Sequence, residues 1–486
     1  MRKRVRLTLI LLLFVAGRLA AQWWHGPFQL TTNSASDIRP SAPRDWLATG
    51  GPALVWQTNR NGNWDIYSRF DSSVNRWGPE IPVCLAQAND VNPVMAGSSV
   101  CVWEREEGDT LSGIRTACYG GHGSWLDSGR IGLSRHAPDD WAEPSVTLID
   151  GVAWAVWLND DSLGHAIYYS FQNDSFWSYP ARAVGDSGML RHARIGRGVV
   201  PGQPGVACPL LVWEKAGDLF YSMCINYSWA APAEVAHSAA LDLNPDVISV
   251  SEMLQEGPWI VWQSTRDGDT AIFVTSPDSF ERGHRVCEPG PVGANTNPAG
   301  IPVAFPADNW EARAEAWVSD RGGNPDIYSS VNLDSLDVLV NADPALDSNP
   351  VLTASDFTLL WCFWQSNRSG NWDIYGSYVY ETGLDECAPI DLTARVLKLS
   401  SNPCRDRVEV GFVPDAFGIG PLELQIRDIA GRLVRAFRIP RPASPAPCAI
   451  VWAGTDSRGH AVPEGCYFLT LKSGAQTLHR KLLLSR

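Results

Sequence analysis

One phrase occurs twice, at widely separated places in this chain. Residues 56–67 read WQTNRNGNWDIY and residues 364–375 read WQSNRSGNWDIY, so that ten of the twelve letters are identical. Seven segments share the broader pattern of a tryptophan followed by a turn and an aromatic or apolar residue, with Ile114 in that last place in the second segment. Their tryptophans, at intervals of 47 to 56 residues, are Trp56, Trp103, Trp157, Trp213, Trp262, Trp317 and Trp364. Such a period, built from short β-rich runs and Gly/Asn/Asp turns, is typical of a propeller or a β-solenoid.

Turns that end in proline precede most of these tryptophans. They read NDVNP (89–93), DLNP (242–245), NTNP (295–298) and DSNP (347–350). Each repeat therefore contains four strands, which is the unit of a propeller blade. Residues 24–40 also resemble 77–93, so we expect the N-terminal segment to supply the outer strand of the last blade and close the ring. The sequence predicts an all-β chain with a seven-bladed β-propeller over residues 22–385, and six or eight blades are the alternatives.

The recurring residues of these segments are expected to pack neighbouring blades together. Large aromatic side chains provide the apolar surface that one thin sheet cannot bury alone. An arginine precedes an aspartate by five residues at Arg60, Arg321 and Arg368, and we expect each pair to meet across its hairpin. The predicted structural positions are Trp56, Asp65, Tyr67, Trp262, Trp317, Asp326, Tyr328, Trp364, Asp373 and Tyr375.

Two further tryptophans lie in the hairpin turns. Trp64 and Trp372 occupy a position that holds proline or threonine in other repeats, so packing does not require tryptophan there. Together with Asn63 and Asn371 they are predicted to bind a surface protein or a glycan. The alternative is that each ring covers its own hairpin.

No cofactor is predicted, and calcium is the alternative. Asn59, Asn61, Asn63 and Asp65 alternate like oxygen ligands, but the glycine is misplaced for an EF-hand and no glutamate follows at its twelfth position. No catalytic residue is predicted either, because the chain has no HExxH, GxSxG or glycine-rich phosphate loop. The predicted function is a binding module, and the alternative is a polysaccharide hydrolase or lyase with its site over the propeller channel.

The N-terminus predicts export. Four basic residues within 2–6, the apolar run LTLILLLFVAG and then Ala20 and Ala21 form the pattern of a signal peptide over residues 1–21. No later segment is apolar enough to cross a bilayer, so we expect an exported protein that is not an integral membrane protein. The formal charge is −14, and removing five basic residues in this segment gives −14 − 5 = −19. Such an acidic surface argues against nucleic acid as a partner.

Some of the eleven cysteines fall on opposite sides of predicted hairpins. Cys101 with Cys118, and Cys208 with Cys224, are candidates for cross-strand disulfides. Buried unpaired thiols are the alternative.

The hairpin phrases FWQSNRSGNWDIY and WVSDRGGNPDIY resemble the repeats of TolB-type, WD-like propellers, whose blades carry a similar S-x-R-x-G-N-x-D-I-Y phrase. The resemblance implies the propeller fold over about residues 22–385. That family commonly has six blades, whereas this chain shows seven anchor tryptophans. It includes partner-binding proteins and enzymes, so it implies no particular activity.

The repeats stop near residue 385. Residues 386–395 are predicted to be a linker, and the strands and AGR, SRG and KSG turns of 396–486 predict an Ig-like β-sandwich. This block resembles the FlgD-like C-terminal sorting domain of type IX secretion. The matching residues are Asn402, Pro403, Gly431, Trp452, Asp456, Gly459, Gly465 and Tyr467. The resemblance implies the type IX secretion machinery as a partner and display at the cell surface, and a plain accessory domain is the alternative.

Overall fold

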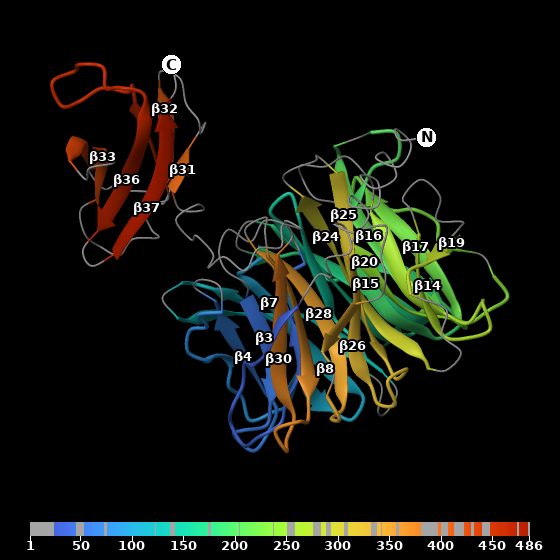
Figure 1. The fold of residues 1–486 in the computed structure, drawn as a ribbon. Coiled ribbons are helices and arrows are strands. Elements are labelled where there is room, and N and C mark those ends of the chain that lie inside the picture. The colour runs from blue at the N-terminus through green and yellow to red at the C-terminus, as the bar shows by residue number, and fades with distance from the viewer. Residues whose placement is uncertain are drawn as a thin grey trace, which may run out of the picture. The chain divides into compact units, whose positions relative to one another are not determined.

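The computed structural model divides the chain into two compact units, Met1–Leu384 and Asp385–Arg486. Every regular element in the part it describes is a β-strand (Figure 1). The prediction of an all-β chain with a propeller followed by a β-sandwich is confirmed. The described residues are 24–44, 53–71, 75–121, 123–136, 141–173, 176–203, 205–236, 238–249, 258–275, 283–287, 293–305, 310–331, 338–341, 343–355, 359–380, 397–399, 407–412, 422–428, 432–439, 448–473 and 476–484.

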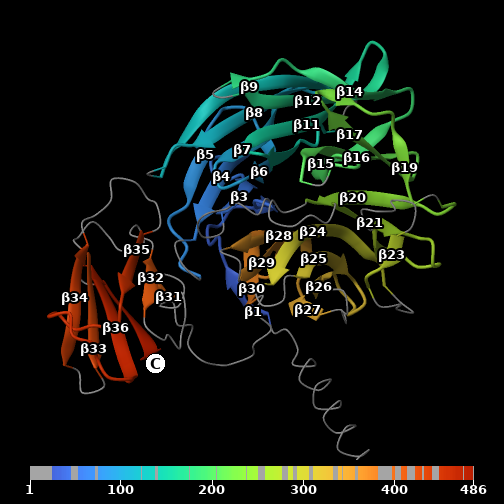
Figure 2. The same cartoon turned by 90° about the horizontal axis from the view of Figure 1, so that it is seen from above.

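The described residues of the first unit form seven antiparallel sheets, numbered 1 to 7 in chain order. Their inner strands face a common centre (Figure 2). Sheets 1 to 3 contain β2 (Asp37–Ser41), β3 (Ala53–Thr58), β4 (Asp65–Phe70) and β5 (Ile81–Cys84); β6 (Asp90–Ala96), β7 (Val100–Gly108), β8 (Leu111–Tyr119) and β9 (Trp125–Arg135); and β10 (Ser145–Ile149), β11 (Val152–Asp161), β12 (Gly164–Asn173), β13 (Phe176–Trp177) and β14 (Ala181–Asp186). Sheets 4 and 5 contain β15 (Leu190–Val199), β16 (Ala207–Lys215), β17 (Asp218–Ile225), β18 (Ser228–Trp229) and β19 (Ala233–Val235); and β20 (Asp242–Ile248), β21 (Trp259–Ser264), β22 (Ala271–Thr275) and β23 (Gly283–Arg285). Sheets 6 and 7 contain β24 (Asn295–Phe305), β25 (Trp310–Ser319), β26 (Asp326–Val331) and β27 (Val338–Asn341); and β28 (Asp347–Ser355), β29 (Leu359–Ser366), β30 (Asp373–Tyr380) and β1 (His25–Gln29).

Sheet 7 combines the two ends of this unit. Strand β1 pairs antiparallel with β30, with Gln29 opposite Tyr375 and Phe28 opposite Gly376. The Phe28 ring stacks on Tyr378 at 5.8 Å between ring centroids. The N-terminal strand therefore covers what would otherwise be an open sheet edge.

The seven anchor tryptophans lie in the second strand of each sheet and are at most 2% exposed. In six sheets the tryptophan is directly opposite the repeat aromatic, as Trp364 is opposite Tyr375. Sheet 2 differs, because Trp103 is opposite Arg115 and Ile114 is opposite Glu104. The equivalence assigned to Ile114 was therefore wrong by one residue.

The hairpin arginines do not pair with the aspartate five residues later. Arg368 donates to both carboxylate oxygens of Asp347 on the inner strand of its own sheet, at 3.0 and 2.8 Å, and its guanidinium lies 4.5 Å from the Tyr375 ring centroid. Arg60 and Arg321 likewise reach the inner strand. The predicted pairs are wrong because the turn folds the arginine back over the aromatic ring.

The aspartates of the repeat phrase hold the neighbouring loop instead. Asp373 accepts a hydrogen bond from the Thr31 hydroxyl at 2.9 Å, and Asp326 accepts one from the Asp343 backbone N–H at 3.2 Å. Asp65 accepts one from the Ala86 backbone N–H at 3.2 Å. These residues are structural, but they fix the outer strand and not the arginine.

The candidate disulfides are absent. Cys101, Cys118, Cys208 and Cys224 are all free thiols. The register explains why for the first pair, because Cys101 is opposite Ala117 and Cys118 is opposite Val100, so the two thiols are offset by one position.

The second unit packs two sheets as a sandwich. One sheet contains β31 (Leu397–Leu399), β32 (Val408–Phe412) and β35 (Cys448–Trp452); the other contains β33 (Leu422–Asp428), β34 (Leu433–Ile439), β36 (Gly465–Ser473) and β37 (Gln476–Leu484). No helix in the described part of the chain is long and apolar enough to cross a membrane.

The sorting-motif residues that are described build this sandwich. Trp452 is buried, meets Tyr467 edge-on at 5.3 Å and donates its indole N–H to the Thr455 carbonyl at 2.8 Å. Asp456 accepts backbone N–H groups of Arg458 and His460 in a turn where Gly459 has φ of 86°. Gly465 begins β36. Asn402, Pro403 and Gly431 lie outside the described residues.

Candidate functional site

Each of the seven sheets carries one residue with a left-handed backbone near the start of its inner strand. Their φ angles lie between 45° and 53°, and in six sheets the strand register shifts at that point, as in a β-bulge. In sheet 3 the residue precedes β10. We call this set the bulge ring, and its members are Arg39, Asn92, Glu143, His192, Asn244, Asn297 and Asn349.

Asparagine is the expected residue for this conformation. Its short polar side chain tolerates the left-handed region, which costs other L-residues about 1–2 kcal/mol. Four sheets follow this rule, and three carry a charged or titratable side chain instead: Arg39, Glu143 and His192. Histidine is also tolerated at this angle, but backbone geometry does not favour arginine or glutamate, so another role must account for Arg39 and Glu143.

In four sheets a second residue holds the ring to its neighbour. The side chain after the anchor tryptophan accepts the backbone N–H of the next ring residue: Gln57 accepts that of Asn92 at 2.8 Å, Glu214 that of Asn244 at 3.4 Å and Gln263 that of Asn297 at 3.2 Å. Across the closure, Gln365 accepts that of Arg39 at 2.8 Å. These bonds hold the sheets in a fixed relation around the centre.

In sheet 3 a different side chain accepts the backbone N–H of the next ring residue. Leu158 follows its tryptophan and cannot accept a hydrogen bond, so the Glu143 carboxylate accepts the His192 backbone N–H at 3.0 Å. The His192 ring is held in turn by Glu214, with Nδ1 at 3.1 Å from Oε2. Part of the reason for Glu143 and His192 is therefore structural.

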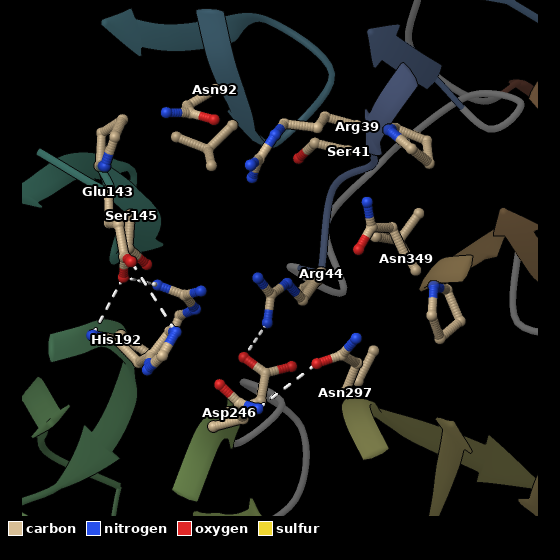
Figure 3. Close-up of a pocket in the computed structure, with 18 of the residues that line it drawn as sticks. Arg39, Ser41, Arg44, Asn92, Glu143, Ser145, His192, Asp246, Asn297 and Asn349 are labelled. Carbon is tan, nitrogen blue, oxygen red and sulfur yellow. Dashed lines mark hydrogen bonds and ion pairs between the residues drawn. The ribbon is translucent and has the colours of Figure 1, made fainter. Parts of the chain in front are cut away.

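The bulge ring surrounds a cavity of about 360 Å³. Figure 3 shows Arg39, Glu143, His192 and asparagines of the ring reaching toward it from different inner strands. The lining also includes Arg44, Arg194, Asp246 and Trp141, the last of which is 37% exposed.

The charged side chains of the lining differ in whether they have hydrogen-bond or ion-pair partners. Asp246 pairs with Arg44 and accepts the Gly300 backbone N–H at 3.1 Å. Glu143 lies 3.9 Å from the Arg194 guanidinium. Within the described residues, the guanidinium of Arg39 makes no hydrogen bond and no ion pair.

Arg39 is an exposed residue that lines this cavity. Desolvation lowers the pKa of its guanidinium, Glu143 acts in the opposite direction, and Arg194 lowers the pKa further. An arginine remains charged under such conditions. The cavity therefore contains a cation whose hydrogen-bonding capacity is unused.

The predicted binding residues lie elsewhere. None of Trp64, Trp372, Asn63 and Asn371 lines the ring cavity. The Asn63 amide donates to the Ala86 and Ala88 carbonyls at 2.9 and 3.0 Å, and Asn371 donates to Ala35 at 2.6 Å. Both tryptophans are half-buried at their turns. Binding at these four residues stays a prediction, although both amides already have structural partners.

A second hollow contains a serine, a histidine and a glutamate close together. Asn63, Ser112, His136 and Trp141 line it. Ser112 Oγ is 3.0 Å from His136 Nε2, and Glu104 Oε1 is 3.9 Å from that same nitrogen. A catalytic triad needs the carboxylate on the opposite ring nitrogen, and Ser112 is only 1% exposed, so this cluster is structural.

Sequence reasoning missed the ring residues, although a signal was present. The turns that read Asn-Pro in four repeats read Arg39-Pro40 and Glu143-Pro144 in two others. The departures from Asn-Pro, not the matches, marked the site. Among the described residues, no group of three or more His, Cys, Asp or Glu side chains could hold a metal ion.

The fold and this site define a class of protein: a β-propeller with a charged cavity at its centre. The chain matches no family model and no curated protein.

Solved structures resemble it only distantly. They include a protein of unknown function from Dyadobacter fermentans (TM-score 0.43, 10% identity, 73% of this chain and 99% of that one). A puromycin-hydrolysing peptidase of Mycobacterium tuberculosis has TM-score 0.43 and 13% identity over 81% of this chain and 61% of its own. An α-L-arabinofuranosidase from Podospora anserina has TM-score 0.28 and 12% identity over 50% and 91%. All three TM-scores are below 0.5, so nothing about this chain follows from these likenesses.

Proposed function

We propose that this protein is an exported binding module whose propeller holds a saccharide in the bulge-ring cavity. The observation that carries the proposal is the ring itself. Asparagine amides and an unpaired arginine converge with an accessible Trp141 on one cavity. A space of about 360 Å³ lies within the usual range for small-ligand sites.

The chemistry of the lining suits a sugar. An amide side chain both donates and accepts, so several amides can serve the hydroxyl groups of a pyranose ring. The face of a tryptophan provides a flat apolar surface for the C–H face of the same ring. Both features belong to the lining of the same cavity.

The hydrolase alternative is less well supported. Glycoside hydrolysis needs two carboxyl groups, one to protonate the leaving oxygen and one as a base or nucleophile. The acids of the lining are Glu143 and Asp246, and each already accepts a backbone N–H, from His192 and Gly300. Held in this way, they favour a structural role over proton transfer.

The test is a glycan-binding screen of the chain from residue 22 to 486, run beside a polysaccharide degradation assay. Trp141→Ala and Trp372→Ala provide matched variants. Loss of glycan binding in the first and retention in the second is the expected result. The reverse pattern would move the site to the hairpin turns, and release of reducing ends by the unmodified chain would establish the hydrolase instead.

We also propose that residues 1–21 direct export and that the second unit sorts the protein through the type IX machinery to the cell surface. The order of basic, apolar and small residues supports the first step. The sandwich built around Trp452 and Tyr467 supports the second. Deleting residues 385–486 in a bacterium with this secretion system should leave the propeller in the periplasm. Normal surface display of the truncated protein would contradict the sorting role.

A further inference from the structure

We infer that the ligand of the bulge-ring cavity carries an oxyanion, a carboxylate or a sulfate ester, and that Arg39 binds it. This inference rests on the proposed function, because it names the class of saccharide that the same cavity takes. The planar guanidinium suits either group, since it can donate two parallel hydrogen bonds to two oxygens of one anion.

Arg39 is an isolated departure from the residue pattern that the rest of sheet 1 keeps. Sheet 1 keeps the regular framework: Trp56 is opposite Tyr67, and Arg60 donates to Asp37 at 3.2 Å and lies 4.2 Å from the Tyr67 ring centroid. Only the ring position departs from the pattern. The departure is therefore local to the side chain that enters the cavity.

The departure also carries a conformational cost. Arg39 has φ of 53°, close to the 52° of Asn349 in the adjacent sheet. Asparagine would adopt this angle more easily, and the hydrogen bond from the backbone N–H to Gln365 does not depend on the side chain. Neither the backbone nor the lock between sheets requires arginine here.

The charge of the cavity is opposite to that of the chain. The chain carries −14, whereas the lining holds Arg39, Arg44 and Arg194 against Glu143 and Asp246, which gives 3 − 2 = +1 with His192 neutral. Asp246 is occupied by Arg44, and Glu143 faces Arg194 and the His192 backbone. The excess positive charge is therefore that of Arg39.

Arg39 is exposed and its guanidinium has no protein partner among the described residues, so an incoming anion can reach it and accept its hydrogen bonds. A charge-assisted bond of this kind corresponds to a difference in affinity of about tenfold to a hundredfold. The Glu143 carboxylate disfavours a second anion near sheet 3, which leaves the side of the cavity toward Arg39 as the position for the charged group.

The experiment measures protection of Arg39 from phenylglyoxal, read by peptide mass spectrometry on the chain from 22 to 486. The probes are galacturonate, its methyl ester, galactose 6-sulfate and galactose. Galacturonate or the sulfate should slow modification of Arg39 about tenfold, the uncharged sugars should not, and exposed Arg135 provides the internal control. Protection by one charged sugar alone identifies which oxyanion is read.

Binding by variants completes the test. Arg39→Asn introduces the residue of four other sheets, so it should fold normally and lose the preference for charged over neutral saccharides, while Arg135→Asn should retain it. If galactose and galacturonate protect Arg39 equally, the saccharide site stands and the anion inference falls. If no sugar protects Arg39 and the glycan screen also shows no binding, the proposed function fails with it.

Discussion

Sheets 5 to 7 and sheets 3 and 4 have the same fold but different chemistry. In sheet 7 the hairpin Arg368 is bound to Asp347 and the ring residue is Asn349. In sheet 4 the equivalent cation is Lys215, which pairs at 2.7 Å with Asp186 of the preceding sheet, and the ring residue is His192. The anchor tryptophan is buried in both. The difference teaches that the buried aromatic frame is sufficient to hold a sheet, so the ring residue can vary.

The largest effect is expected for the frame itself. Trp262→Ala in sheet 5 and Trp213→Ala in sheet 4 should each lower the free energy of unfolding by about 3–5 kcal/mol, because both remove a fully packed indole. Urea denaturation followed by circular dichroism measures the change. Trp372→Ala, at a half-buried turn, is the control with a small effect. A much smaller loss for Trp213→Ala would show that the two groups of sheets do not share one frame.

Removing the hairpin cation should lower the free energy of unfolding more in sheet 7 than in sheet 4. Arg368→Ala leaves the buried Asp347 carboxylate without its charged partner and should cost about 2–3 kcal/mol. Lys215→Ala breaks a pair that is only half-buried on both sides and should cost less than about 1 kcal/mol. The same denaturation measurement applies, and equal losses would remove this distinction.

Substitutions at the ring position should change the free energy of unfolding in opposite directions in sheets 6 and 1. Asn297→Ala places alanine at φ of 50° and should destabilise the protein by about 1 kcal/mol. Arg39→Asn should leave stability unchanged or raise it by up to about 1 kcal/mol. A clear destabilisation by Arg39→Asn would mean that the arginine supports the fold and would weaken its assignment to ligand binding.

The smallest effect is a pH dependence at Glu104, which is 0% exposed and accepts the Ala142 backbone N–H at 3.1 Å. Desolvation raises the pKa of this carboxyl above 4.5, while hydrogen bonds from Ser112, Ala142 and Asn92 and the charge of His136 oppose the shift. The folded state therefore prefers the protonated form. This contribution is complete below pH 4.5 and is lost as the pH rises through the raised value. Relative to Glu104→Gln, the unmodified protein should lose stability as the pH rises, and parallel curves would contradict this.

Most strands of the seven sheets could be predicted from local sequence patterns. The spacing of the tryptophans and the Asn-Pro turns identified the strands, because apolar periodicity and turn chemistry are local properties. The partner of each arginine could not be predicted. Whether Arg368 meets Asp373 or Asp347 depends on how the turn folds back, and the error at Ile114 arose because an insertion in sheet 2 changed the strand register.

The candidate site was the least predictable part. Trp64 and Trp372 stood out in the sequence because they varied within a repeated phrase, yet they do not reach the central cavity. Arg39 and His192 lie within β2 and β15, at the position where four other sheets have asparagine. Only a comparison of all seven bulge positions reveals them, and the register shifts define which positions those are.

The amino-acid sequence alone determined that this chain builds a series of similar antiparallel sheets, because each sheet is specified by contacts between residues close together in the chain. The tertiary structure decided which side chains share a cavity. Arg39, Glu143 and His192 belong to three different sheets, and all three line one cavity from the left-handed position near the start of an inner strand. The closure between β1 and β30 was predicted from the likeness of residues 24–40 to 77–93, but its register, with Gln29 opposite Tyr375, is visible only in the tertiary structure.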